Sequence, residues 1–155
     1  MSTQFDVIYD RFLGKITDDM YMEWTAEDTK ADMKNILVDA IPGFEFPRFH
    51  LYDYDLDNNS YNADLTSEEV HILALLMYNT WLQRQIASIE NIRMKYSGTD
   101  FKMTSQANHL DKLIKLKQEA EKQTHRAQRL YRRRKTKDGE IESNWTRLME
   151  SSALE

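Results

Sequence analysis

Residues 53–64 carry the densest set of potential metal ligands in the chain. Counted from Asp53, acidic oxygens fall at positions one, three, five and twelve, which is the spacing of a calcium-binding loop. Three positions depart from that pattern, because Asn58 replaces the turn glycine, Ser60 an apolar residue and Asp64 the bidentate glutamate. The flanking residues are aromatic and do not show the pattern of an entering helix. We therefore interpret the segment as a solvated Asx turn and predict no metal site there.

A basic cluster follows Tyr131 near the end of the sequence. Its members are Arg132, Arg133, Arg134 and Lys135. Such a cluster can grip nucleic-acid phosphates. It can also complement the dipole at the C-terminal end of a helix while docking on an acidic protein partner or a neighbouring subunit. Because the pI of the whole chain is about 5.4, we favour a protein contact. Nucleic-acid binding and a simple solvated surface stay open as alternatives.

The other residue types that carry chemistry are scattered. The histidines are His50, His71, His109 and His125, and no two have the spacing of a helical ligand pair. The absence of cysteine excludes a disulfide scaffold, a thiolate zinc site and a cysteine nucleophile. Four glycines form no phosphate-binding loop, and no serine lies in a nucleophile elbow. The sequence therefore predicts a protein that is not an enzyme and binds no cofactor.

Charge is unevenly distributed along the 155 residues. Residues 1–80 contain 5 Lys and Arg against 16 Asp and Glu, a net charge of -11. Residues 81–155 contain 16 against 10, a net charge of +6, so the whole chain carries -5. The halves can pair within one chain, or the acidic half of one copy can pair with the basic half of the next. The second arrangement would build a head-to-tail ring or filament, and charge alone leaves both open.

The elements that position these residues are mainly helical, since six glycines and prolines are few for a turn-rich all-β fold. Apolar spacings of three and four predict a short helix over residues 4–13 and a second helix from Thr25 to Pro42. A capping box at residues 66–69 opens a long helix through Tyr96. Residues 18–24 match helix and strand patterns equally well.

A second long helix begins near Ser105. Its predicted apolar positions are Leu110, Leu113, Ile114, Leu116, Ala120, Ala127 and Leu130. We expect a small, mainly α helical bundle over residues 1–136, followed by an extended C-terminal tail over residues 137–155.

Six aromatic residues crowd into residues 44–65, around an Asp-Asn-Asn-Ser turn signal. This pattern predicts a short hairpin or an ordered loop inserted in the helical domain. An extended aromatic element can grip a partner protein. The candidates here are Phe46, Phe49, Tyr52 and Tyr54.

The tail carries Trp145, Leu148 and Met149 at spacings of three and four residues, which would place them on one face of a short helix. They either fold back on the bundle or dock on another chain. The N-terminus shows no signal-peptide pattern. The longest run without a charged residue, 70–83, has 14 residues where a span needs about 20. We expect a protein that enters no membrane and is made in the cytoplasm.

The order of the predicted elements and two short sequence segments indicate a known family. The segments are Lys95-Tyr96-Ser97-Gly98-Thr99-Asp100-Phe101-Lys102 and Ser105-Gln106-Ala107-Asn108-His109-Leu110. With the long basic helix and the tail that follow, residues 66–150 resemble the head–tail connector (adaptor, or head completion) proteins of tailed bacteriophages. Those proteins are small helical bundles that bind beneath the portal as a twelve-fold ring.

The resemblance implies a structural virion protein of the phage neck, made in the bacterial host cytoplasm. Its expected partners are the portal protein, other neck or tail proteins and further copies of itself, close to the DNA channel. By position in the chain, Trp145, Leu148 and Met149 would reach into the portal. The alternative is a cytoplasmic helical regulatory or nucleic-acid-binding protein that uses residues 132–135 as its contact.

Overall fold

The computed structural model describes residues 2–16, 24–96, 103–137 and 140–143. Over these ranges the chain is mainly helical, as the sequence predicts. The four α-helices are α1 (Phe5–Leu13), α2 (Ala26–Ala40), α3 (Ser67–Tyr96) and α4 (Met103–Arg133). One 3-10 turn, η2 (Ile41–Gly43), follows α2. The strands are β1 (Thr3–Gln4), β2 (Tyr54–Asp55), β3 (Ser60–Tyr61), β4 (Arg134–Lys137) and β5 (Glu140–Ser143).

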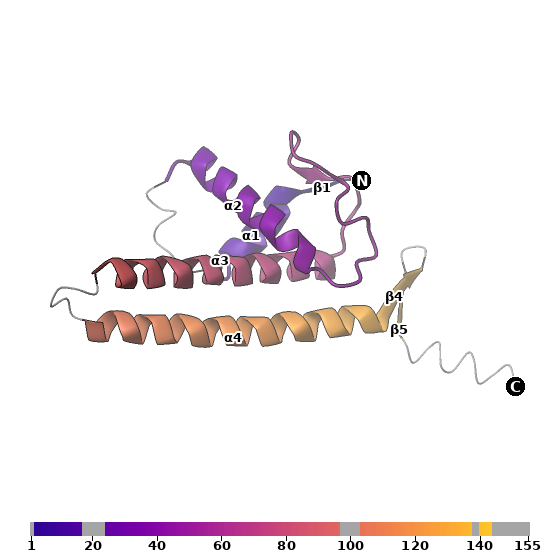
Figure 1. Ribbon diagram of the computed structural model, residues 1–155. Helices are drawn as coiled ribbons and strands as arrows, with labels where there is room; N and C mark the ends of the chain where they lie inside the picture. Colours follow the sequence, from indigo (N-terminus) through magenta and orange to yellow (C-terminus); the bar gives the residue numbers. More distant parts are fainter. Residues whose placement is uncertain (1, 17–23, 97–102, 138–139, 144–155) are drawn as a thin grey trace, which may run out of the picture.

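The helices form three layers (Figure 1). Helix α3 lies in the middle and packs against α1 and α2 on one side and against α4 on the other. We call α1, α2 and the strands β1–β3, with their described connections, the N-terminal layer (residues 2–16 and 24–66). Helix α3 therefore has a partner on both sides, which explains why its residues 72–77 are all buried.

Both short helices form where the sequence predicts them. The stripe of α1 that faces α3 is Phe5, Ile8, Tyr9 and Phe12, all buried. The side chain of Thr25 caps α2 by accepting a hydrogen bond from the backbone N–H of Asp28 at 3.1 Å. Pro42 ends α2 in the 3-10 turn, where a Cβ on Gly43 would lie 2.9 Å from Leu76 Cδ2. Glycine thus lets the end of α2 pack closely on α3.

The aromatic segment contains the predicted hairpin in a very short form. Strands β2 and β3 pair antiparallel, with Tyr54 opposite Tyr61, and β1 adds to the other edge of β3. Thr3 Oγ1 also accepts a hydrogen bond from the N–H of Leu65 at 2.8 Å. The N-terminus of the chain therefore holds the hairpin against α3.

A row of edge-to-face ring contacts connects the N-terminal layer with α4. Phe5 contacts Tyr61 with ring centroids 5.6 Å apart, and Tyr61 contacts Phe49 at 5.4 Å. Phe49 contacts Phe44 at 5.6 Å, and Phe44 contacts Tyr131 at 5.4 Å. Each such pair contributes ~0.5–1.5 kcal/mol beyond its buried area. This row explains why residues 44–65 are ordered with so little regular secondary structure.

Helices α3 and α4 meet along a seam with a seven-residue repeat. On α4, Leu110, Thr124 and Tyr131 are buried in one row, and Leu113 and Ala120 are buried in a second. This spacing is that of a coiled coil. The predicted stripe is wrong at two positions, because Leu116 and Leu130 are both 40% exposed. A seven-residue repeat leaves them outside the seam.

Strands β4 and β5 form a hairpin directly after α4, with Arg134 opposite Ser143 and Lys137 opposite Glu140. Residues 140–143, assigned to the tail from the sequence, therefore pair with residues 134–137, which include Arg134 and Lys135 of the basic cluster. Trp145, Leu148 and Met149 lie outside the described residues. So do residues 97–102 of the segment that begins at Lys95, and residues 18–23 of the segment that matches helix and strand patterns equally well.

Candidate functional site

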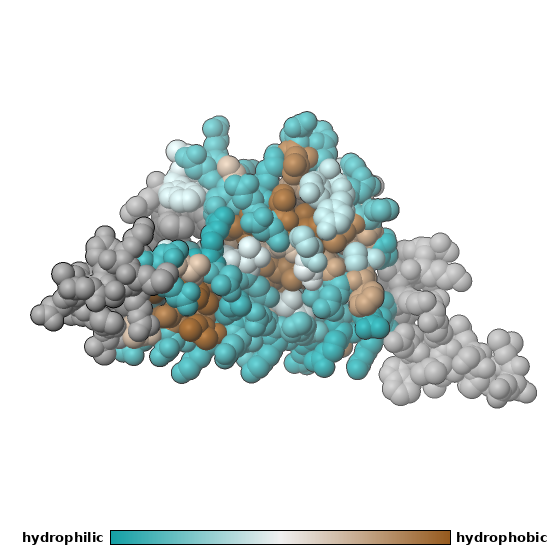
Figure 2. Space-filling view, in the orientation of Figure 1, coloured by the Kyte–Doolittle hydropathy of each residue, from teal (hydrophilic) through white to brown (hydrophobic). Residues whose placement is uncertain are grey.

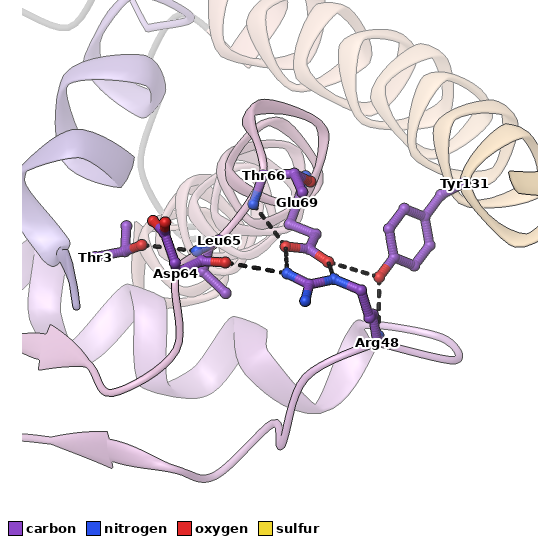
Figure 3. A network of polar contacts seen from close by, with 7 residues as sticks. All are labelled: Thr3, Arg48, Asp64, Leu65, Thr66, Glu69 and Tyr131. Carbon is purple, nitrogen blue, oxygen red and sulfur yellow. Dashed lines mark hydrogen bonds and ion pairs between the residues drawn. The ribbon is translucent and has the colours of Figure 1, made fainter. Parts of the chain in front are cut away.

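The C-terminal end of α4 is attached to the rest of the molecule through the fully buried carboxylate of Glu69 (Figure 3). Its Oε1 accepts a hydrogen bond from the Tyr131 hydroxyl at 2.8 Å and one from Arg48 Nε at 3.1 Å. Its Oε2 accepts from Arg48 Nη2 at 3.2 Å and from the backbone N–H of Thr66 at 2.7 Å. One carboxylate thus joins α3, the aromatic segment and α4.

The local sequence explains why Glu69 lies there. It is the last residue of the predicted capping box, and Thr66 Oγ1 accepts a hydrogen bond from its N–H at 3.3 Å in return. The cap orients the carboxylate, and the positive charge of Arg48 compensates for its burial. Arg48 Nη2 also donates to the carbonyl of Asp64 at 3.0 Å. The hydrogen bond to Glu69 raises the pKa of the Arg48 guanidinium.

The hydroxyl of Tyr131 both donates and accepts a hydrogen bond. The O–H donates to Glu69, and the oxygen accepts the backbone N–H of Arg48 at 2.8 Å. Burial raises the pKa of Tyr131 well above its ordinary value, and the hydrogen bond to Glu69 adds to the rise. The phenol therefore stays neutral, as a two-way hydrogen bond requires.

One turn earlier on α4, Gln128 makes a second attachment to the aromatic segment. Its amide oxygen accepts the backbone N–H of Glu45, and its amide nitrogen donates to the carbonyl of Gly43 at 3.2 Å. The side chain is only 4% exposed. The two attachments pair the main chain of residues 43–48 with α4 side chains, so this loop and the end of α4 form one rigid unit.

This unit presents an exposed aromatic and basic surface, which we call the docking surface: Phe46, Arg132, Arg133 and Arg134. Phe46 is 64% exposed and has a positive φ of 54°. The guanidinium of Arg132 lies over its ring, 4.5 Å from the centroid. Such a backbone conformation is costly for a bulky residue and is often retained for function.

The structure divides the four predicted aromatic site residues into two exposed rings and two rings that pack in the core. Tyr52 is 64% exposed like Phe46, whereas Phe49 is buried and Tyr54 is partly buried beside Tyr61. The latter two rings belong to the core, where they hold the hairpin, and they do not form an exposed aromatic surface. Lys135 lies in β4.

The basic cluster contacts its own chain at two points. Arg134 forms an ion pair with Glu68 at 3.1 Å, and Arg132 is stacked on Phe46. Arg133 is exposed. The cluster is therefore held in place at the start of α3 and against the aromatic segment.

Sequence reasoning missed the residues that hold this surface. Arg48 and Gln128 carry no motif, and Glu69 was recognised only as a local cap. The seven-residue repeat of Leu110, Thr124 and Tyr131 was the available signal, because it places a tyrosine in a helix seam.

The acidic turn has the predicted Asx geometry. Asp55 Oδ1 accepts the backbone N–H groups of Asp57 at 2.8 Å and Asn58 at 3.1 Å. These hydrogen bonds, led by that from Asn58, lower the pKa of Asp55. In the part of the chain that the structure describes, no three acidic or histidine side chains cluster as metal ligands. No helix in that part is long and apolar enough to cross a membrane.

The groups available for chemistry at this end of the molecule are guanidinium groups, the exposed ring of Phe46 and a loop held by hydrogen bonds to α4. Comparisons with protein-family models, with curated proteins and with solved structures found no match to this chain.

Proposed function

We propose that this chain is a structural virion protein of a phage neck, which binds the portal as an oligomeric ring and links the DNA-filled head to the tail. The observation that carries the proposal is the separation of opposite charges onto opposite sides of α3. A protein that assembles with copies of itself needs complementary surfaces that face away from each other.

The charge of each layer follows from its residues. The N-terminal layer holds 11 Asp and Glu against 5 Lys and Arg, a net charge of -6. Helix α4 holds 8 Lys and Arg against 3 Asp and Glu, a net charge of +5. Because α3 lies between them, the folded chain leaves the two charges exposed on different sides (Figure 1). This supports pairing between copies over pairing within one copy.

The docking surface supports the second half of the proposal, a contact with a different neck protein. It is exposed, it is held by the hydrogen bonds of Gln128 and Tyr131, and it lies where α4 passes into β4. The C-terminal residues follow this point in the sequence. Under the proposal it meets the portal protein together with Trp145, Leu148 and Met149. The ring has twelve copies by resemblance, and the chain is made in the host cytoplasm before it enters the virion.

The test is fractionation of the native source on a density gradient, with detection of this chain in virion-sized particles. The proposal expects co-sedimentation with intact particles in a fixed ratio. A chain found wholly in the soluble fraction would overturn it. Gradient sedimentation is preferable to sizing the isolated chain, because ring formation can depend on the portal as a template.

A nucleic-acid-binding helical protein is the second candidate, favoured by the exposed arginines at the end of α4. Charge reversal at Arg132, Arg133 and Arg134 separates the two functions. In that candidate the triple variant loses retention on DNA or RNA. Under the neck proposal it chiefly loses assembly with partner proteins.

A further inference from the structure

A small pocket lies between the C-terminal end of α1 and the helices α3 and α4. Its volume is about 230 Å³, below the ~300 Å³ at which small-molecule sites usually begin. Its lining residues from α3 and α4 are Tyr78, Trp81, Gln85, His109, Lys112, Leu113 and Leu116. Lys15 and Ile16 line it just beyond α1. A pocket of this size fits one or two protein side chains.

The pocket has an apolar part and positively charged or polar groups around it. Trp81 is 8% exposed and stacks on Tyr78 with centroids 6.1 Å apart, while Leu116 is 40% exposed. The charged lining groups among the described residues are Lys15 and Lys112, and no described carboxylate lines the pocket. Burial, and after it the nearby Arg11, lowers the pKa of Lys15. The pocket therefore suits an apolar side chain that is flanked by carboxylates.

The turn of the β2–β3 hairpin presents such a side chain. Leu56 is 42% exposed and stands between Asp55 and Asp57. The turn is held in shape by the Asx hydrogen bonds of Asp55 and by Lys34, whose ammonium donates to the carbonyl of Leu56. Holding the turn in advance lowers the entropy lost when it binds.

Figure 2 shows an apolar patch at the top of the view, where Figure 1 places the hairpin turn, with hydrophilic residues around it. The hairpin pairs with β1, directly before the first residue of α1, whereas the pocket lies beside Lys15 and Ile16, just beyond the last. A projection and a pocket at opposite ends of α1 are joined most simply between two copies, and the contact then repeats from copy to copy.

We propose that Leu56 of one copy inserts into the Trp81 pocket of the next, with Asp55 and Asp57 facing Lys15 and Lys112. This inference rests on the proposed ring and names the surfaces that build it. The occupant is a second copy because the same chain supplies both the acidic apolar projection and the basic apolar pocket.

Since the chain contains no cysteine, introduced cysteines can test the contact. Full-length Leu56→Cys is mixed at high concentration with full-length Leu116→Cys and oxidised. The control partner is Leu130→Cys, because Leu130 is also on α4, is equally 40% exposed and lies outside the pocket. We expect about tenfold more cross-linked product with Leu116→Cys than with Leu130→Cys, the ratio that ~1.4 kcal/mol of preference produces.

Equal cross-linking at the two positions would overturn the contact. The double variant Leu56→Cys/Leu116→Cys tests the geometry: a contact repeating from copy to copy yields a ladder of covalent multimers. Dimers alone would overturn the head-to-tail arrangement. If the chain co-sediments with particles but neither cross-link forms, the neck function stands and this contact fails.

Discussion

The hydroxyl oxygen of Tyr131 lies 2.8 Å from the carboxylate of Glu69, which joins the last turn of α4 to the first turn of α3. The same carboxylate closes the N-terminal cap of α3. One buried group therefore serves both the start of one long helix and the attachment of the other. The position of the docking surface depends on it, because Arg132 follows Tyr131 directly.

Replacement of Tyr131 by phenylalanine tests this attachment. Tyr131→Phe keeps the ring contact with Phe44 but removes the donor to Glu69 and the acceptor for the N–H of Arg48. We expect a loss of about 1–3 kcal/mol in the free energy of unfolding, as for other buried groups that lose a partner. Urea denaturation measures it. Tyr52→Phe is the control, because that side chain is 64% exposed and its variant should unfold at the wild-type midpoint.

Two substitutions at Glu69 separate its two roles. Glu69→Gln retains an oxygen that can accept the N–H of Thr66, as glutamine does in other capping boxes, but it loses the charge opposite Arg48. Glu69→Ala loses both. We expect the alanine variant to lose roughly 3 kcal/mol, near the lower end for a broken buried pair because Arg48 is 36% exposed. The glutamine variant should lose clearly less. Equal losses in the same denaturation experiment would show that the cap contributes nothing.

Stability should fall at high pH because burial raises the pKa of Tyr9, Tyr61 and Tyr131. A raised pKa means that the folded state keeps the proton that the unfolded chain releases near pH 10. The stabilisation is therefore complete below pH ~10 and is lost as the pH rises toward the folded-state values. Three such groups give a slope of about -4 kcal/mol per pH unit.

Denaturant midpoints between neutral and strongly alkaline pH measure this slope, with tyrosinate absorbance followed in parallel. If the absorbance of all tyrosines rises before unfolding, the three hydroxyls are not protected by burial.

The parts of the fold that depend on local patterns were predictable from the sequence. Thr25 and the Thr66 capping box begin helices as expected, and Gly14 and Pro42 end them. The aromatic segment forms a short hairpin, and its acidic turn has Asx geometry. Each of these features depends on residues within a few positions of one another.

The candidate site was only partly predictable because its contacts join residues far apart in the sequence. Gln128 bonds to Gly43 across 85 positions, and Tyr131 to Glu69 across 62. The seven-residue repeat of α4 marks Tyr131 as a seam residue, but no periodicity identifies its partner. Composition alone also could not show which rings of the aromatic segment are exposed and which are buried. Phe46 and Phe49 are the same residue type, and only the fold exposes one and buries the other.

The strained residue of the docking surface offers a final prediction, which separates stability from partner binding. Phe46 has a φ of 54°, a region that glycine adopts without penalty and that costs other residues about 1 kcal/mol or more. Phe46→Gly removes this strain and also removes the ring beneath Arg132, a contact that contributes ~0.5–1 kcal/mol at exposed sites. We therefore expect its stability to stay close to that of the wild type.

Phe46→Ala is the matched comparison, because it removes the same ring and keeps the strained backbone. It should be about 1 kcal/mol less stable than Phe46→Gly in urea denaturation, and equal stability would contradict the strain. Both variants should enter virion-sized particles less than the wild type does, because both lack the exposed ring. If Phe46→Gly is incorporated as well as the wild type, Phe46 does not contact a partner, and its backbone conformation serves only the fixed loop of residues 43–48.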